Sequence, residues 1–237
     1  MPGSALKAGA RKLIFENSPR LLFISLLYVV LIAVVSWLSF RLPGNINTQD
    51  IYSRLASGEM PGLGIIYTNF RPTGVFLALL LLLLQPIIDV GFISYCMKIN
   101  RSQKTELKDL FNGFLFFIKV LSVFIISAVF IFLWSLFFVI PGIVASYRYR
   151  QAYYILLDDP GKSALSCITE SKLMMHGKKL DLFILDLSFF GWYVLDFIIF
   201  ILLPFSFAIP IVSVWLSPYI GLTRAAFYDN QIAGIAV

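Results

Sequence analysis

The 237-residue chain is strongly apolar: 59% of its residues are hydrophobic, only 14% are charged, and its mean hydropathy is +0.86. A soluble domain is about half apolar and a quarter charged, so the composition excludes an ordinary soluble protein. The net charge of +6 does not indicate nucleic-acid binding, because the basic residues lie beside hydrophobic runs and do not form one soluble face. We therefore expect an integral membrane protein whose basic residues contact anionic lipid headgroups.

The predicted fold is an all-α integral membrane protein with about six transmembrane helices, formed as a single polytopic domain over residues 1–237. A helix needs about 20 apolar residues to cross a hydrocarbon core of roughly 30 Å, and the alternating pattern of a membrane β-barrel is missing from the sequence. The predicted spans, in chain order and to within several residues, are 21–40, 73–97, 114–140, 141–157, 182–203 and 207–224.

The fourth predicted span, 141–157, differs from the others because it is short and contains two arginines. It follows Ile140-Pro141-Gly142, a sequence that predicts a tight turn or a helix break. A re-entrant segment that lines a cavity is therefore an alternative to a complete span.

Basic residues gather in an N-terminal segment, 1–20, and in two later segments, 98–113 and 158–181. The positive-inside rule places all three segments in the cytoplasm, together with both termini. The connection 41–72 has mixed charge and several Gly, Asn and Pro residues, so we expect it to be the main external loop.

Each basic segment also predicts a short amphipathic helix that lies along the inner membrane surface just before a span. Two apolar faces follow the helical period; their residues are Leu6, Ala10, Leu13 and Ile14 in the first segment, and Ala164, Leu165, Ile168 and Met175 in the last. This recurrence predicts three repeats of an interfacial helix plus a membrane hairpin. The alternative is that any membrane hairpin needs a polar leading helix.

The segment from Ile140 to Trp192 contains a series of short motifs. They are Ile140-Pro141-Gly142-Ile143, Ser146-Tyr147-Arg148-Tyr149, Ala152-Tyr153-Tyr154-Ile155-Leu156, Asp158-Asp159-Pro160, Ser163-Ala164-Leu165, Ser171-Lys172, Met175-x-Gly177-Lys178-Lys179 and Leu187-Ser188-Phe189-x-Gly191-Trp192. The pattern resembles an uncharacterised bacterial integral-membrane family, domain-of-unknown-function family 975, which is distantly similar to the membrane domain of some glycerophosphodiester phosphodiesterases. The resemblance implies a bacterial inner-membrane location but no activity, since the soluble phosphodiesterase barrel is absent from the sequence.

Three residues of this segment have a structural interpretation that does not depend on the family. Asp159 suits a helix N-cap, Pro160 suits the first helical position, and Gly177 suits a helix C-terminal stop. We therefore expect a cytoplasmic helix between Pro160 and Gly177.

Arg148 and Arg150 are the strongest functional candidates, because charges inside apolar segments persist only where they face the protein interior, a partner or water. Arg148 would lie about 10 Å below an external turn at Pro141, at 1.5 Å per residue. The carboxylates that accompany them in apolar segments are Asp89, Asp186 and Asp196. These charges predict either a polar cavity for an anionic substrate or a set of structural ion pairs.

Further candidates surround the arginines. Tyr147 and Tyr149 are candidates for ligand contacts, although tyrosines also anchor membrane interfaces and pack cores. Pro86 predicts a kink that is either a gate or simple curvature, and Pro141 with Gly142 predicts the turn before the fourth span.

Signs of catalysis are poor. The chain has one histidine, His176, which excludes a histidine-rich metal site, and it has neither a Gly-x-Ser-x-Gly elbow nor a phosphate-binding loop. An intramembrane aspartyl enzyme would need two facing carboxylates, for which Asp89 with Asp186 or Asp196 is the remote option. We predict a protein that is not an enzyme and that uses no metal or cofactor.

The predicted function is to bind or transport a small anionic or amphiphilic substrate through a polar intramembrane cavity. The alternative is a non-catalytic interaction or assembly protein whose intramembrane ion pairs are structural. The expected partners are anionic membrane lipids, the small substrate, and either further copies of the chain or another membrane protein. Nucleic acid is not expected.

Overall fold

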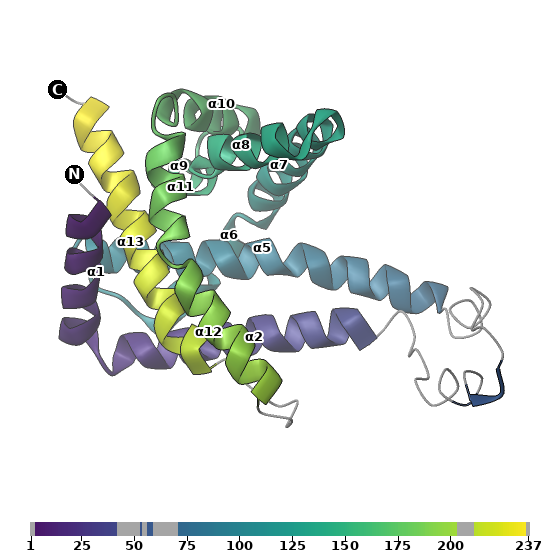
Figure 1. Ribbon diagram of the computed structural model, residues 1–237. Helices are drawn as coiled ribbons and strands as arrows, with labels where there is room; N and C mark the ends of the chain where they lie inside the picture. Colours follow the sequence, from purple (N-terminus) through teal and green to yellow (C-terminus); the bar gives the residue numbers. More distant parts are fainter. Residues whose placement is uncertain (1–2, 42–52, 54–55, 59–70, 203–210, 236–237) are drawn as a thin grey trace. The chain divides into compact units, whose positions relative to one another are not determined.

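The computed structural model describes residues 3–41, 53, 56–58, 71–202 and 211–235 (Figure 1). These residues form helices and turns without a strand among them, which confirms the predicted all-α class. The helices are, in chain order, α1 (Gly3–Asn17), α2 (Arg20–Arg41), α5 (Pro72–Asn100), the 3₁₀ helix η1 (Leu107–Phe111), α6 (Asn112–Leu115), α7 (Phe117–Phe137), α8 (Val139–Tyr149), α9 (Ala152–Asp158), α10 (Ala164–Met174), α11 (Lys179–Leu187), α12 (Phe190–Leu202) and α13 (Ile211–Ile235).

The chain divides into two compact units. One unit comprises Met1–Val30 together with Pro86–Val237, and the other comprises Leu31–Gln85. In the second unit the guanidinium of Arg41 lies 5.6 Å from the ring of Trp37 on the preceding turn of α2. Nearly all of the predicted external loop, 41–72, lies outside the described residues. The candidate site lies in the first unit.

Four helical segments are long and apolar enough to cross a membrane, judged by length and composition of the described residues. They are Arg20–Ser39, Pro72–Asn100, Phe117–Phe137 and Lys179–Ile199, and they correspond to the first, second, third and fifth predicted spans. The last of these has a break at Ser188 and Phe189, between α11 and α12.

The other two predicted spans are not confirmed. The fourth is split into α8, with 11 residues, and α9, with 7, and each is too short to cross a membrane alone. The described part of the sixth belongs to α13, which is not among the four apolar segments, while residues 203 and 207–210 of the predicted spans lie outside the described residues. The three predicted repeats stay a prediction.

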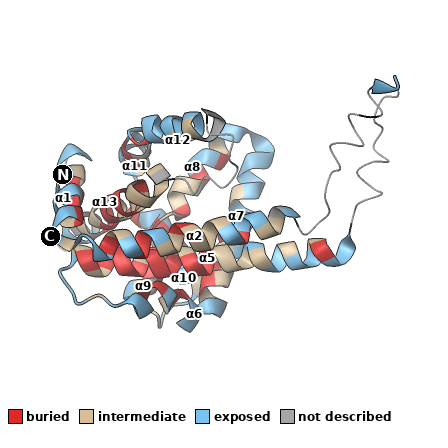
Figure 2. Ribbon diagram, turned by 90° about the horizontal axis from the view of Figure 1, so that it is seen from below, coloured by how far each residue is buried: buried red, intermediate tan, exposed pale blue. Residues whose placement is uncertain are grey.

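The core of the first unit surrounds the second half of α5, which Figure 2 shows in red. Glycines let neighbouring backbones approach it. A Cβ atom on Gly91 would lie 1.7 Å from the carbonyl oxygen of Leu110 in η1, and one on Gly113 of α6 would lie 1.9 Å from that of Ile87. The predicted interfacial segment 98–113 thus packs its backbone directly against a helix of the protein.

Helix α1 is amphipathic as predicted, and its apolar face contacts protein. Leu6, Ala10 and Ile14 are buried where α1 packs against α13, whereas Leu13 is half-buried. Lys7 reaches the junction of α11 and α12, where its Nζ lies 4.4 Å from the ring centroid of Phe189. The predicted position of α1 at the membrane surface stays a prediction.

Helix α10 begins later than predicted. Its N-cap is Ser163, whose Oγ accepts a hydrogen bond from the backbone N–H of Ser166 at 3.2 Å. Asp159 instead accepts from the N–H of Gly161 at 3.0 Å, which closes a tight turn through Pro160 and postpones the helix. Gly177, with φ of 75°, lies just beyond the end of α10, as predicted for a helix stop.

The buried face of α10 also differs from the predicted one. Ile168 and Met175 are buried, but Ala164 is half-buried and Leu165 is 58% exposed. Cys167, Ser171 and Met174 are also buried. Helix α10 packs against three helices, α7, α8 and α9, so its buried residues do not follow a single stripe.

The turn between α7 and α8 lies at Phe138, which has an extended backbone, and not at Pro141 and Gly142. Pro141 is the third residue of α8, where a helix tolerates proline because the N–H groups of the first turn have no partner inside the helix. A Cβ atom on Gly142 would lie 2.0 Å from Ser135 Oγ, so this glycine permits close packing of α8 on α7. Pro86 is buried inside an α5 that continues past it, and its role as a gate stays a prediction.

Candidate functional site

Asp186 of α11 is contacted by two arginines, one from α13 and one from the turn between α8 and α9. Arg224 of α13 donates from Nε to Asp186 Oδ1 at 3.0 Å, and its Nη2 lies at the same distance from that oxygen. Arg150, between α8 and α9, places Nη2 3.6 Å from Asp186 Oδ2. One carboxylate therefore serves two guanidinium groups, and these three residues form what we call the Asp186 cluster.

The Asp186 cluster has an excess of positive charge in a half-buried position. The side chains of Asp186, Arg224 and Arg150 are 12%, 25% and 35% exposed. Two guanidinium groups face one carboxylate, so one positive charge is left without a partner inside the cluster. In such partly desolvated surroundings an unbalanced charge attracts an anion more strongly than it would in water.

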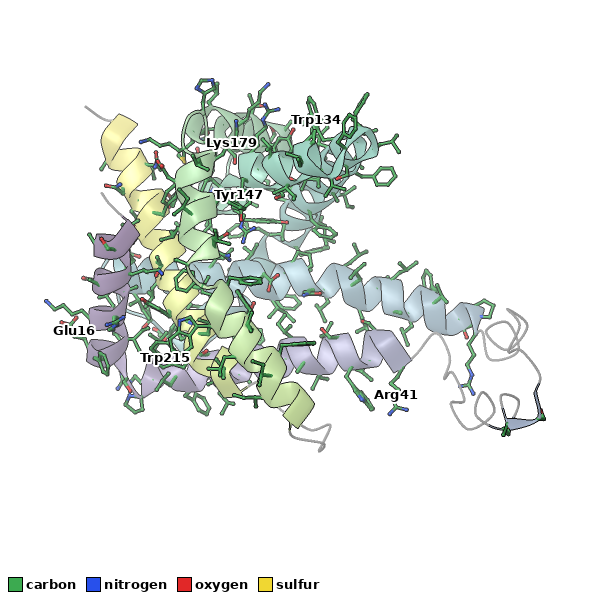
Figure 3. All side chains as sticks on the ribbon, in the orientation of Figure 1. Glu16, Arg41, Trp134, Tyr147, Lys179 and Trp215 are labelled. Carbon is green, nitrogen blue, oxygen red and sulfur yellow. The ribbon has the colours of Figure 1, made fainter. Side chains whose placement is uncertain are left out.

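Tyr147 lies beside this cluster, and Tyr149 does not. The Tyr147 ring packs edge-on against Phe183 of α11 with ring centroids 5.7 Å apart, and the guanidinium of Arg150 lies 5.7 Å from the Tyr147 ring (Figure 3). Tyr149 is 8% exposed and packs against Phe130 of α7. Of the two predicted tyrosines, only Tyr147 is placed next to an arginine of the site.

The two predicted arginines point to different neighbours. Arg148 places its guanidinium 5.9 Å from the ring of Trp134 on α7. Its Nε is buried without a hydrogen-bond partner, and no ion pair joins it to another described residue. Residues two apart on a helix are separated by about 200° around the axis, so Arg148 and Arg150 face nearly opposite sides.

The three predicted aspartates have separate partners. Tyr28 of α2 donates its hydroxyl to Asp89 Oδ1 at 2.9 Å and stacks on Phe92 with ring centroids 4.2 Å apart. Ser213 of α13 donates to Asp196 Oδ2 at 2.7 Å. Of the three aspartates, only Asp186 contacts a predicted arginine, Arg150. Asp89 and Asp196 accept hydrogen bonds from hydroxyl groups.

Sequence reasoning missed Arg224, which is the best-placed partner of Asp186. It lies at the end of the sixth predicted span, next to the apolar residues Leu222 and Ala225, both fully buried. The rule that drew attention to Arg148, an ionisable residue in an apolar run, applies equally to Arg224.

Sequence reasoning also missed a second cluster, in which Arg101 joins the ends of three segments. Its guanidinium donates to Asp158, the last residue of α9, and to Asp229 of α13, each through contacts as short as 2.6 Å. Asp158 accepts a further hydrogen bond from Tyr228, and Asp229 accepts one from Asn100. The hydrogen bonds to Asp158 and Asp229 raise the pKa of Arg101, which remains charged at every ordinary pH.

A comparison with known protein families gave a match over the part of the chain that contains the Asp186 cluster. Residues 136–233 match the model of a family described as a protein of unknown function, DUF975. Over these residues the chain is similar to the DUF975 family. No curated protein and no solved structure matched the chain.

The DUF975 segment contains every member of the Asp186 cluster, as well as Arg148 and Asp196, but neither Asp89 nor Arg101. It begins just before the turn between α7 and α8 and includes α8 to α12 and most of α13. The family resemblance predicted from the motifs is confirmed. The more distant likeness to the membrane domain of glycerophosphodiester phosphodiesterases stays a prediction.

Proposed function

We propose that this membrane protein binds a small anionic or amphiphilic substrate at the Asp186 cluster, as the binding step of transport. The observation that supports the proposal is the charge balance of the cluster, in which two half-buried guanidinium groups share one carboxylate. An anion that approached Arg150 would neutralise the charge that Asp186 leaves unbalanced.

The chemistry of the arginines favours a carboxylate or a phosphate group as the recognised anion. A guanidinium presents a planar fork of N–H donors that matches both groups. Arg150 is held only loosely by Asp186, since the closest contact is 3.6 Å, so its donors are free to turn toward a ligand. Tyr147 adds an aromatic ring and a hydroxyl beside this fork.

Transport would need an energy source outside the Asp186 cluster. The sequence has no phosphate-binding loop, so a proton or ion gradient or a separate ATPase would have to supply the energy. Asp89 and Asp196 are the candidates for proton carriers, because ionisable side chains inside apolar segments commonly form proton relays.

The test is a binding assay on protein in nanodiscs, with phosphatidylglycerol and inorganic phosphate as separate probes and with folding of every variant checked. Loss of one charged contact is expected to weaken binding about tenfold to a hundredfold in Arg150→Ala and Arg224→Ala. Arg11→Ala, which changes an exposed arginine of α1, is the matched control and should leave binding unchanged.

Asp186→Asn gives the sharpest result. If the cluster binds anions, removing the competing carboxylate strengthens binding, because both guanidinium groups become available. Unchanged binding of both probes in the arginine variants and in Asp186→Asn would refute the proposal.

A structural role is the second candidate function, and a specific observation favours it. Asp89, Asp196, Asp158 and Asp229 each have a hydrogen-bonded partner within the chain, as expected for charges that hold helices together. In that case Asp186→Asn and Arg224→Ala would lower the melting temperature without changing the binding of either probe. The protein would then serve in membrane interaction or assembly.

A further inference from the structure

The tip of the α7–α8 hairpin is entirely apolar and exposed. Residues 136–140, which include the turn at Phe138, are between 72% and 75% exposed. The sequence from Leu136 to Ala145 contains no polar or charged side chain. A turn between helices that ends in water normally contains polar, Gly, Asn or Asp residues, so this turn has the composition of a surface that contacts hydrocarbon.

Burial by protein ends abruptly along α7. Val120 and Val123 are fully buried and Ser127 is 9% exposed. The following part of α7 exposes large apolar side chains, namely Val129, Phe130, Phe132, Leu133, Trp134, Leu136 and Phe137. The hairpin therefore has a base that is packed into the protein and a distal part whose large apolar side chains are mostly exposed.

The base of the α7–α8 hairpin contacts the polar helix α10. Ser171 of α10 donates from Oγ to the carbonyl oxygen of Arg148 at 2.9 Å and accepts from the N–H of Gln151 at 3.2 Å. The same helix exposes Lys172 and holds an ion pair between Lys162 and Glu170 at 2.7 Å. Its charged side chains require water or headgroups, so Arg148 and Gln151 lie at the depth of the membrane surface.

The length of α8 then fixes how deep the tip can reach. Its 11 residues extend about 16 Å at 1.5 Å per residue. The hydrocarbon core is about 30 Å thick, so α8 reaches roughly to its centre and not across it.

The backbone of the turn fits a hydrocarbon environment as well. The first N–H groups of a helix have no partner within it, and an unpaired donor in hydrocarbon costs several kcal/mol. Pro141 has no N–H, and the N–H of Gly142 reaches the carbonyl oxygen of Phe138 at 3.4 Å. The bond from Gly142 is the ordinary first bond of a helix, so Pro141 alone lowers the number of free donors at the start of α8, by one.

We infer that the α7–α8 hairpin enters and leaves the membrane on one side, with residues 136–140 in contact with lipid acyl chains near the bilayer centre. Arg148 and Arg150 then lie at the depth of the lipid phosphates, not at mid-membrane. The hairpin is a wedge that occupies one leaflet, and its partner is the hydrocarbon of the bilayer. This inference does not depend on the proposed substrate.

The test is cysteine labelling of the full chain in membranes with a membrane-impermeant maleimide applied from each side. Phe138→Cys and Ile140→Cys change exposed side chains, so neither opens a hole in the core. Thr169→Cys, on the exposed face of α10, is the positive control, and the parent protein with its two buried cysteines gives the background.

We expect Thr169→Cys to be labelled from one side, while the two tip variants are protected from both sides and are labelled after denaturation in SDS. Labelling of the tip from the side opposite to Thr169 would show a hairpin that spans the membrane. Labelling from the same side would show a tip in water. Either result would overturn the inference.

A spin label at position 138 distinguishes lipid from a protein partner. A tip among acyl chains should collide frequently with dissolved oxygen and rarely with a water-soluble nickel chelate. A label protected from both reagents would lie in a protein contact, and this result would also overturn the inference.

Discussion

Arg101 and Asp158 are joined by two parallel hydrogen bonds of 2.6 and 3.0 Å, although 57 positions separate them in the chain. The same guanidinium bonds Asp229, which lies 128 positions away, through two further contacts of 2.6 and 2.9 Å. The segments that follow α5 and α9 and the second half of α13 were each predicted to be cytoplasmic. A single side chain holds these three parts of the first unit together.

Arg101→Ala should destabilise the fold by about 2 kcal/mol, because two carboxylates lose a bidentate, charge-assisted partner. Arg101→Lys should recover only part of the loss, since an ammonium group cannot bond both carboxylates with paired N–H donors. The measurement is the melting temperature in detergent. Lys12→Ala breaks an exposed ion pair with Glu16 and serves as the control, which should melt like the parent; equal melting of all four proteins would contradict a structural role for Arg101.

Asp109 should make the fold sensitive to acid. The carboxylate is 3% exposed and accepts hydrogen bonds from Lys98 at 2.6 Å and from the N–H of Glu106 at 2.8 Å. Burial by itself raises its pKa, but these hydrogen bonds and the charge of Lys98 lower the pKa below the ordinary value of 3.8. The stabilisation is therefore complete above the unfolded pKa and is lost as pH falls through the folded pKa.

Asp109→Asn should accordingly cost about 2 kcal/mol at pH 7, and the difference from the parent should shrink below pH 4. Melting temperatures measured between pH 3 and pH 7, a range that starts below the ordinary pKa of Asp and ends well above it, would show the two curves converging toward acid. A gap that stays constant across this range would mean that the ionised form of Asp109 contributes nothing specific.

Gly91→Ala and Gly113→Ala should each disrupt the packing of η1 and α6 on α5. The added methyl group would lie within 2 Å of a backbone carbonyl oxygen in each case, and a backbone cannot yield as a flexible side chain can. Gly9→Ala in α1 is the matched control, because its Cβ would meet nothing within 4 Å and alanine favours a helix by roughly 0.5–1 kcal/mol. Size-exclusion profiles and melting temperatures in detergent should show loss of the folded protein for the first two variants only.

The two cysteines should react with maleimide only when the protein unfolds. Cys96 and Cys167 are both fully buried, and burial raises the pKa of the Cys167 thiol, which disfavours the reactive thiolate. A fluorogenic maleimide should therefore report the same melting temperature as light scattering or circular dichroism. Rapid labelling of the folded protein at neutral pH would contradict the packing of α10 and α5.

The sequence indicated the helical class and the apolar face of α1 because both depend on local composition and on the 3.6-residue period. It could not show that α13 covers that face, since periodicity identifies an apolar stripe but not its neighbour. The turn at Phe138 was missed for a related reason: Pro141 can end a helix or occupy its first turn, and only tertiary packing decides. Arg101 depends on two carboxylates that are distant in sequence, and no local pattern connects them.

The sequence alone predicts that Arg148 and Arg150 face different sides of their helix, because they are two residues apart. Two residues at i and i+2 of a helix do not face each other, so helix geometry predicts that Arg148 and Arg150 do not share one carboxylate. In the structure Arg150 contacts Asp186, and Arg148 lies over the ring of Trp134.

The packing of α1 against α13 has a consequence for biosynthesis. The two helices stand at opposite ends of the described sequence, so α1 is made long before the ribosome produces the helix that covers it. Until then the nascent chain exposes Leu6, Ala10 and Ile14, and an amphipathic basic helix in that condition binds the membrane surface. We therefore expect α1 to lie at the membrane surface during synthesis and to leave it when α13 packs against it.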